Sequence, residues 1–255
     1  MHTNKLKEAL LAGKPQIGVQ ISHIRSIEIP RILGAAGFHW AFIDGEHGVY
    51  HAESIYDLNK VCALCGVTPV VRVASLQYDL IARTLDTGAQ GIIFPRVESV
   101  ELLEQAVAWT KFPPLGVRGF GLGAVHMDYQ RMTIPATMEL VHREALNVLQ
   151  IESVKAFEMR DELLSVKGVD AVLVGPADLS ISMGIPGEFT NPKLVDTVEK
   201  IRDACLKHNV IPGIHNRGAD MAKFWIDRGM KLVGCGNEAV MLFEKASENA
   251  KALLG

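Results

Sequence analysis

Short apolar runs rich in β-branched residues recur along the chain, and each is followed by a stretch with helical spacing. We expect strands at Gln16–Ile21, Trp40–Ile43, Pro69–Val73, Gly91–Phe94, Asn147–Ile151, Ala171–Val174, Val210–Ile214 and Lys231–Cys235. These runs are nearly continuous in apolar residues, as expected of parallel strands buried on both faces. About eight strand–helix units predict an α/β fold, a (β/α)₈ TIM barrel, with a doubly wound open sheet as the second choice.

Residues that start and stop helices support this division. Ser99 precedes the helical pattern from Val100 to Trp109 and can cap it. Gly88, Gly168 and Gly229 stand where helices should end before the next strand. The expected strands and helices therefore alternate in a consistent register.

One connection, between the fourth and fifth expected strands, is much longer than the others. It contains residues 112–123, a segment rich in Gly and Pro that favours irregular structure. A long connection in a compact barrel usually has a function. No linker, charge block or low-complexity segment divides the chain, so we expect one domain over residues 1–255.

Composition and charge narrow the classes of function. Hydrophobic residues make up 48% of the chain and charged residues 22%, enough for a large core. A net charge of -3 offers no basic field, so we expect no nucleic-acid and no membrane partner. The first 14 residues lack the apolar centre of a secretory signal, and no run of about 18 apolar residues occurs. We therefore predict a soluble, cytoplasmic protein.

The four cysteines do not suggest a disulfide framework in a chain of this length. Cys62 and Cys65 are the one closely spaced pair, and their spacing raises the question of a zinc or redox motif. They belong to an expected helix from Ser54 to Leu64, where i,i+3 spacing places both on one apolar face. Core packing is the favoured interpretation.

Polar residues gather at the ends of the expected strands, where barrel enzymes carry their reactive groups. In chain order these are Asp44-Gly-Glu-His47, Arg72, Phe94-Pro-Arg96, Gln150-Ile-Glu152 and Gly175-Pro-Ala-Asp178. Because the carboxyl ends of parallel strands meet at one rim, we expect these groups to converge on one mouth.

Glu152 and Asp178 follow neighbouring strands, so their carboxylates can hold one divalent cation. Two ligands leave most of an octahedral shell open, which suits Mg²⁺, Mn²⁺ or Co²⁺, with Zn²⁺ as a further candidate, and leaves room for a 2-oxo acid. The backbone N–H groups of Ala177 and Asp178 should also point into the mouth and cradle a carboxylate. The alternative makes Asp178 an N-cap for a helical turn over Leu179–Met183 and Glu152 a first-turn acid.

Arg72 ends a strand that is otherwise apolar. Its guanidinium either stabilises an enolate oxygen or forms a rim ion pair with Asp44 or Glu46. His47 stands beside two acids, and an imidazole oriented by a carboxylate is the usual general acid/base near neutrality.

Asp86 lies in the last turn of an expected helix over Asp79–Asp86, where an acid opposes the helix dipole. A second interaction should favour an acid there. We infer that Asp86 orients a histidine, with a subunit contact as one setting for that pair and a solvated helix end as the alternative.

Other chemistries find less support in the sequence. Lys231 opens its strand at the wrong end and Lys155 lies one turn into a helix, so metal activation is favoured over a Schiff base. Gly119-x-Gly121-x-Gly123 does not follow a strand, which argues against a nicotinamide cofactor. Gly234-Cys-Gly236 comes after the last expected strand, where barrels often bind phosphate, so a phosphorylated substrate stays open.

Four segments closely resemble the HpcH/HpaI aldolase family, and the match runs from Lys5 to about Leu242. They are Phe42-Ile-Asp-Gly-Glu-His47, Gly116-Val-Arg-Gly119, Gln150-Ile-Glu152 and Gly175-Pro-Ala-Asp-Leu-Ser180. The chain looks most like the 4-hydroxy-2-oxoheptanedioate and 2-dehydro-3-deoxyglucarate aldolase branch. The resemblance implies a class II aldehyde-lyase of aromatic or sugar acid catabolism, which reversibly cleaves 4-hydroxy-2-oxo acids into pyruvate, or hydroxypyruvate, and an aldehyde.

The resemblance also assigns roles to individual residues. Glu152 and Asp178 would bind the metal, Gln150 and the Gly175-Pro176-Ala177 turn would bind substrate, and Arg72 would stabilise the enolate. His47 would be the acid/base, supported by Asp86 and Asp44. The family implies a homohexamer, a trimer of dimers that exchange their last helices, here the segment after Asn237.

The mouth departs from the family at three positions. Gln20 ends the first strand where members of this branch have an aromatic residue, and His215 and Asn216 follow the seventh expected strand where they have small or apolar residues. The mouth is therefore more polar, which leaves the aldehyde open. Two alternatives remain: a decarboxylase of oxaloacetate-like acids, and a non-catalytic barrel that binds 2-oxo acids.

Overall fold

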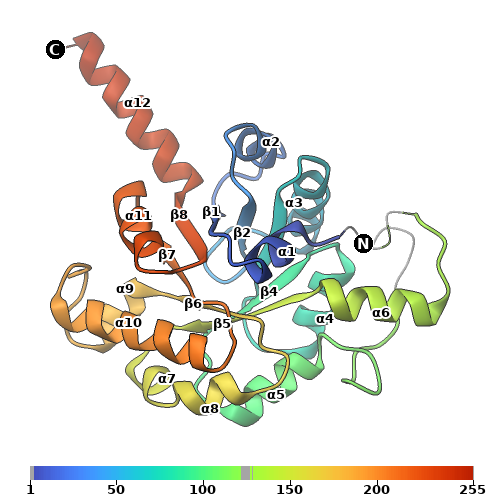
Figure 1. The fold of residues 1–255 in the computed structure, drawn as a ribbon. Helices are drawn as coiled ribbons and strands as arrows, with labels where there is room; N and C mark the ends of the chain where they lie inside the picture. The colour runs from blue at the N-terminus through green and yellow to red at the C-terminus, as the bar shows by residue number, and fades with distance from the viewer. Residues whose placement is uncertain (1–2, 122–126, 128, 255) are drawn as a thin grey trace.

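The computed structural model describes residues 3–121, 127 and 129–254. Eight parallel strands pair in chain order and close into a barrel, so the (β/α)₈ prediction is confirmed (Figure 1). The strands are β1 (Gln16–Ile21), β2 (Trp40–Asp44), β3 (Thr68–Arg72), β4 (Gly91–Phe94), β5 (Leu146–Ile151), β6 (Ala171–Val174), β7 (Gly213–Asn216) and β8 (Leu232–Asn237).

Helices cover the outside of the barrel and one end (Figure 1). They are α1 (Lys5–Leu11), α2 (Glu28–Ala35), α3 (Ala52–Leu64), α4 (Tyr78–Asp86), α5 (Val100–Ala108), α6 (Ile134–Glu144), α7 (Val154–Glu158), α8 (Arg160–Ser165), α9 (Pro176–Ser182), α10 (Pro192–Lys207), α11 (Ala219–Asp227) and α12 (Glu238–Leu254). No helix of the described chain is long and apolar enough to cross a membrane.

Helix α1 closes the end of the barrel where the strands begin. Its two buried residues, Leu6 and Leu10, pack with Trp40, Val70 and other side chains from inside the barrel. Because burial of these apolar side chains fills this end, the open mouth lies at the carboxyl ends of the strands.

The expected helix ends are also observed. The Ser99 side chain accepts a hydrogen bond from the Leu102 N–H at 3.2 Å and caps α5. Gly88 and Gly229 follow α4 and α11 with φ of +100° and +96°, a conformation that favours glycine. Cys62 is fully buried in the core, as expected, whereas Cys65 is half-buried, follows the last residue of α3 and packs at the edge of the same cluster.

The predicted position of the seventh strand is wrong. The prediction ran from Val210 to Ile214, whereas β7 begins at Gly213. Pro212 has no N–H to donate to a ladder, and Ile211 forms only an isolated bridge with Ala171. His215 and Asn216 therefore lie within β7, and not after it as predicted.

The eighth strand was also placed too early, because Gly234 and Gly236 lie within β8 and not after it. A Cβ on Gly234 would lie 2.1 Å from Nδ1 of His215, and Gly236 has a φ of +72°. Close packing and backbone conformation thus account for both glycines without a phosphate loop.

The long connection after α5 is irregular from residue 109 to residue 133 wherever the structure describes it, as predicted. Its last part is helical, because α6 fills most of the remaining distance to β5. Gly123 and Leu122, which end the predicted glycine-rich segment, lie outside the described residues. Phe112 and Arg118 are buried, so this connection packs against the barrel at two points.

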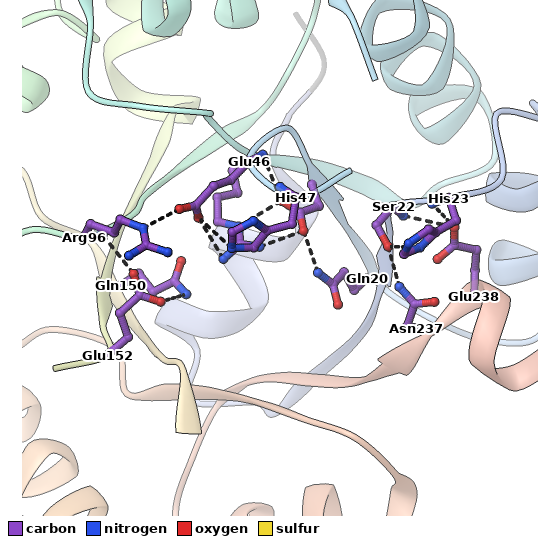
Figure 2. A network of polar contacts seen from close by, with 12 residues as sticks. Gln20, Ser22, His23, Glu46, His47, Arg96, Gln150, Glu152, Asn237 and Glu238 are labelled. Carbon is purple, nitrogen blue, oxygen red and sulfur yellow. Dashed lines mark hydrogen bonds and ion pairs between the residues drawn. The ribbon is translucent and has the colours of Figure 1, made fainter. Parts of the chain in front are cut away.

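Helix α12 leaves the barrel and extends away from it (Figure 1). Its first residue, Glu238, is buried, and Oε1 of Glu238 accepts hydrogen bonds from the backbone N–H groups of Ser22, His23 and Ile24 at 3.0, 2.6 and 2.8 Å (Figure 2). The start of the helix is therefore tied to the loop after β1, and Met241 packs against the core, while Leu242, Phe243, Leu253 and Leu254 are exposed.

Candidate active site

A cavity of about 660 Å³ opens at the carboxyl ends of the strands. Its wall contains seven predicted site residues, His47, Arg72, Gln150, Gly175, Pro176, Ala177 and Asp178. Residues of β7, α10, α11 and α12 form the opposite wall. The strand-end pattern thus placed these groups at a common mouth.

Asp44 and Arg72 face each other across the last register pair of β2 and β3. Arg72 donates from Nε to Oδ1 of Asp44 at 2.9 Å and from Nη2 to Oδ2 at 2.7 Å. Burial opposes ionisation of Asp44, but the hydrogen bonds and charge of Arg72 outweigh it and hold the pKa of this carboxyl below its ordinary value. Arg72 is therefore both ion-paired and part of the cavity wall. The ion pair with Asp44 and a position facing the reaction centre, which the sequence analysis treated as alternatives, are both present.

Glu46 connects this pair to a second arginine (Figure 2). Its Oε2 lies 3.1 Å from Nη1 of Arg72, and its Oε1 accepts a 2.7 Å hydrogen bond from Nε of Arg96. Nε2 of His47 is 3.9 Å from the same Oε2, whereas Asp44 reaches His47 only through its backbone N–H. In this chain the carboxylate beside the His47 imidazole is thus Glu46.

Glu152 is buried, with both oxygens held by neighbours. Gln150 donates to its Oε2 at 2.6 Å and the backbone N–H of Arg96 donates to its Oε1 at 3.0 Å. Arg96 adopts this position with a φ of +53°, which is uncommon for a residue with a side chain. Burial, followed by the nearby charges of Asp178 and Glu46, raises the pKa of Glu152.

Asp178 is the third residue of α9, whose N-cap is Gly175, so the alternative interpretation of Asp178 as an N-cap is wrong. Pro176 opens the helix one turn earlier than expected, because proline is favoured at the first helical position. The Asp178 side chain is consequently free to face the mouth, where it is exposed. A Cβ on Gly175 would lie 3.2 Å from Oε2 of Glu152, so this glycine leaves space beside the carboxylate.

These residues fit a divalent cation. Glu152 and Asp178 supply two hard oxygen ligands, and Oε1 of Gln150 is a buried acceptor without a partner. No group of three or more His, Cys, Asp and Glu that could hold a metal occurs among the described residues. Protein ligands would therefore fill only part of the shell, with room for substrate oxygens and water.

Asp86 has a different partner from the predicted one within this chain. Its Oδ1 accepts a 2.6 Å hydrogen bond from Nη2 of Arg118, a fully buried guanidinium of the long connection. Burial lowers the pKa of Arg118, and the charge of Asp86 opposes that shift. This contact explains why an acid is favoured at the end of α4.

Gln20 and His215 also line the cavity, and they differ in their polar partners. Gln20, in β1, donates from Nε2 to Oδ2 of Asp44 at 2.7 Å. His215 packs edge-on against Phe42, with ring centroids 5.3 Å apart, and its buried Nδ1 has no hydrogen-bond partner. Burial, aided by the charge of Arg72, lowers the pKa of His215 to about 4, so its imidazole is neutral near pH 7.

The site includes residues to which the sequence analysis gave no role. Arg96 was noted only for its position after a strand, which was the available signal, and Glu46 only as a possible ion-pair partner of Arg72, without its contact to Arg96. Arg217 and Phe189 also line the cavity, but nothing in the sequence brought them together.

An eight-stranded parallel barrel with its polar groups at the carboxyl ends of the strands is the architecture of a TIM-barrel enzyme. The sequence profile of the HpcH/HpaI aldolase/citrate lyase family matches residues 25–244. The chain belongs to this family, which confirms the resemblance. It is therefore an enzyme, a carbon–carbon lyase.

Individual relatives agree with this assignment. A 4-hydroxy-2-oxo-heptane-1,7-dioate aldolase from Escherichia coli (strain ATCC 8739) is 31% identical over 252 residues, which cover 99% of this chain and 95% of the relative. The crystal structure of an HpcH/HpaI aldolase from Desulfitobacterium hafniense DCB-2 is 32% identical, with a TM-score of 0.93 over 97% of this chain and 96% of the other. The citrate synthase SbnG is 25% identical, with a TM-score of 0.87 over 97% and 96%.

Proposed function

We propose that this enzyme reversibly cleaves 4-hydroxy-2-oxo acids into pyruvate, or hydroxypyruvate, and an aldehyde, with the help of a divalent cation. The observation that carries the proposal is a mouth lined by Arg72, Gln150 and exposed Asp178, with the buried carboxylate of Glu152 held directly beside it by the amide of Gln150. The activity for which the Escherichia coli relative is named supports the same reaction. Mg²⁺, Mn²⁺ and Co²⁺ are the preferred cations, because the ligands are oxygens.

The protein would hold the 2-oxo acid from two directions. The amide of Gln150 and the backbone N–H of Ala177, at the start of α9, would bind and orient its carboxylate. The guanidinium of Arg72, locked by Asp44, would face the oxygen that becomes negative in the enolate and stabilise that charge without reorganising. When bound, the cation would supply Lewis-acid polarisation of the same oxo group.

His47 would move the proton of the aldehyde-derived hydroxyl, directly or through water. Its side chain is 57% exposed at the mouth, and Glu46 lies beside it. We also propose that Asp86 from another subunit supports this histidine, because its second oxygen is not bonded to Arg118.

Removal of the metal tests the central claim. Protein treated with a chelator should lose retro-aldol activity and regain it with Mg²⁺, Mn²⁺ or Co²⁺. Glu152→Gln should weaken cation binding, measured by calorimetry, by more than about a hundredfold, since changes even to outer-shell partners cost 10- to 100-fold. Glu98→Gln, which removes a more exposed acid at the same rim, is the matched control. Full activity without metal, or trapping of pyruvate on a lysine by borohydride, would contradict the proposal.

Decarboxylation of oxaloacetate-like acids is the second candidate, because it forms the same enolate and needs the same residues. A panel of aldehydes with pyruvate separates the two. Rapid release of CO₂ from oxaloacetate without a new C–C bond to any aldehyde would favour decarboxylation. A non-catalytic binding protein is distinguished by Arg72→Ala, which would then have no activity to remove.

We further propose a homohexamer of dimers that exchange α12. Apolar side chains of this helix are exposed in the single chain, with Phe243 at 71% and Leu242 at 63%, and an exposed apolar helix face indicates a partner. Phe243→Asp should convert hexamers into smaller species in light scattering. Glu248→Lys, on the same helix, controls for a change of charge, and an unchanged mass for Phe243→Asp would contradict the exchange.

A further inference from the structure

The cavity wall holds two arginines in different situations. Arg72 is enclosed and its guanidinium contacts both Asp44 and Glu46. Arg217, which follows β7, is exposed, and no carboxylate pairs with it among residues 3–121, 127 and 129–254. One cation of the wall is thus already neutralised, while the other is available to a ligand.

The Arg217 guanidinium is nevertheless held in place. Its Cζ lies 5.4 Å from the centroid of the Phe189 ring, which also lines the cavity. Stacking on an aromatic face restrains an arginine without using its N–H groups. Its donors therefore remain free for a planar anion such as a carboxylate, or for a phosphate.

The surface beside Arg217 includes partly exposed apolar side chains. Phe189, on which Arg217 stacks, and Met221 both line the cavity, and they pack against the hydrophobic cluster that contains the buried Leu194, Val198 and Trp225. A short carbon chain would bury apolar surface there, but a lone polar head group would not. The cavity also exceeds the space that a three-carbon 2-oxo acid requires, so it has room for the second product.

We propose that Arg217 binds an anionic group, a carboxylate or a phosphate, on the far end of the aldehyde, whose carbon chain lies along this apolar wall. This assignment of a specificity-determining residue rests on the proposed aldol reaction. The acids of the same wall are Asp178, which belongs to the proposed cation site, and Glu244 of α12. Neither forms an ion pair with Arg217 in the described structure.

His215 is suited to the space between the two arginines. Its Nδ1 is enclosed beside Gly234, which leaves Nε2 as the nitrogen that can reach a ligand in the cavity. A neutral imidazole offers a hydrogen bond to a hydroxyl without adding a second charge for the anion. It would contact the middle of the substrate, with Arg217 at its end.

Aldol addition of pyruvate to matched aldehydes tests the role of Arg217. The anionic aldehydes are succinic semialdehyde and glyceraldehyde 3-phosphate, and their neutral counterparts are butanal and glyceraldehyde. Arg217→Gln should lower kcat/KM about 10- to 100-fold for at least one anionic aldehyde, the loss expected for a charged hydrogen bond, and less than about threefold for the neutral ones. Arg217→Lys should retain part of the preference.

Arg228→Gln is the matched control, because Arg228 is stacked on Phe224 with its Cζ 3.5 Å from the ring centroid and does not line the cavity. It should leave all four values unchanged. An equal change for anionic and neutral aldehydes in Arg217→Gln would overturn the assignment. So would a preference of the unmodified enzyme for both neutral aldehydes.

Failure of the reaction itself is distinguishable from failure of this assignment. If no aldehyde reacts with the unmodified enzyme, the proposed function is overturned, and binding then decides the role of Arg217. Calorimetry with succinic semialdehyde would be done in the presence of Mg²⁺ and oxalate, a planar dianion that occupies the 2-oxo acid half. Weaker binding to Arg217→Gln supports the anion subsite, and equal binding overturns it.

Discussion

The two walls of the cavity differ in how their polar groups are satisfied. On the wall formed by β2 to β6, Arg72, Asp44, Glu46, Arg96 and Glu152 form a continuous series of hydrogen bonds and ion pairs (Figure 2). On the wall formed by β7 and the helices around it, neither the imidazole of His215 nor the guanidinium of Arg217 makes a hydrogen bond or an ion pair in the described structure. The first wall is organised in advance, whereas the second awaits its ligand.

This difference follows from burial and suggests a division of labour. Asp44 is 0% exposed and Arg72 6%, and charges taken out of water require partners. Arg217 remains exposed to water and needs none. Fixed dipoles and charges favour a transition state with a constant structure, which suits the enolate half that all substrates share. Groups without partners suit the half that varies between substrates.

The largest expected effect comes from loosening the organised wall. Arg72→Lys retains the positive charge but cannot make the paired hydrogen bonds to Asp44, so the cation should lose its fixed direction. We expect kcat for retro-aldol cleavage to fall about 10²- to 10³-fold, as for removal of a group that stabilises an oxyanion. Arg143→Lys, an exposed arginine paired with Glu144, is the control. A kcat close to that of the unmodified enzyme would show that the pairing is structural only.

A smaller effect should appear in the stability of the metal-free protein. The folded state raises the pKa of Glu152 above its ordinary value of 4.5. The protonated carboxyl therefore stabilises the folded state at low pH, and this contribution is lost as the pH rises through the raised pKa. Glu152→Gln avoids this loss, because a neutral amide does not ionise. The Oε1 atom of Gln150 has no partner, so the Gln150 amide can turn and accept a hydrogen bond from the new side-chain N–H. We expect Tm in chelator to rise by a few degrees at pH 7 to 8 and to be unchanged near pH 4.

Differential scanning fluorimetry across this pH range measures that difference, and saturating Mg²⁺ should reverse its sign at pH 7. A Glu152→Gln variant that is less stable than the unmodified protein at every pH without metal would contradict the argument. Such a result would mean that the ionised Glu152 carboxylate does not destabilise the metal-free protein.

The smallest effect concerns the wall with unpaired groups. His215→Leu removes one neutral hydrogen bond, so the ratio of kcat/KM for glyceraldehyde over butanal should fall about 3- to 10-fold. With a pKa of about 4, His215 is neutral above about pH 5, and this ratio should be constant from pH 5.5 to 8 in the unmodified enzyme. An inflection in that range that disappears in His215→Leu would show that the histidine titrates near neutrality.

Much of the site could be predicted because strand ends are visible in a sequence. Apolar runs reveal parallel strands, and the polar residue after each run then lies at a known rim, as for Arg72, Glu152 and Asp178. The placement fails where a local feature interrupts the apolar pattern. Pro212 shifts the start of β7, and so places His215 on the strand.

The sequence by itself determined the barrel, its family and the rim that carries the reactive groups, because burial on both faces of a parallel strand leaves a pattern in consecutive residues. Only the tertiary structure decided which of those groups are paired. Contacts such as Arg96 with Glu46, Asp86 with Arg118 and Arg217 with Phe189 join distant segments. Side-chain direction after barrel closure determines such contacts, and no local pattern encodes it.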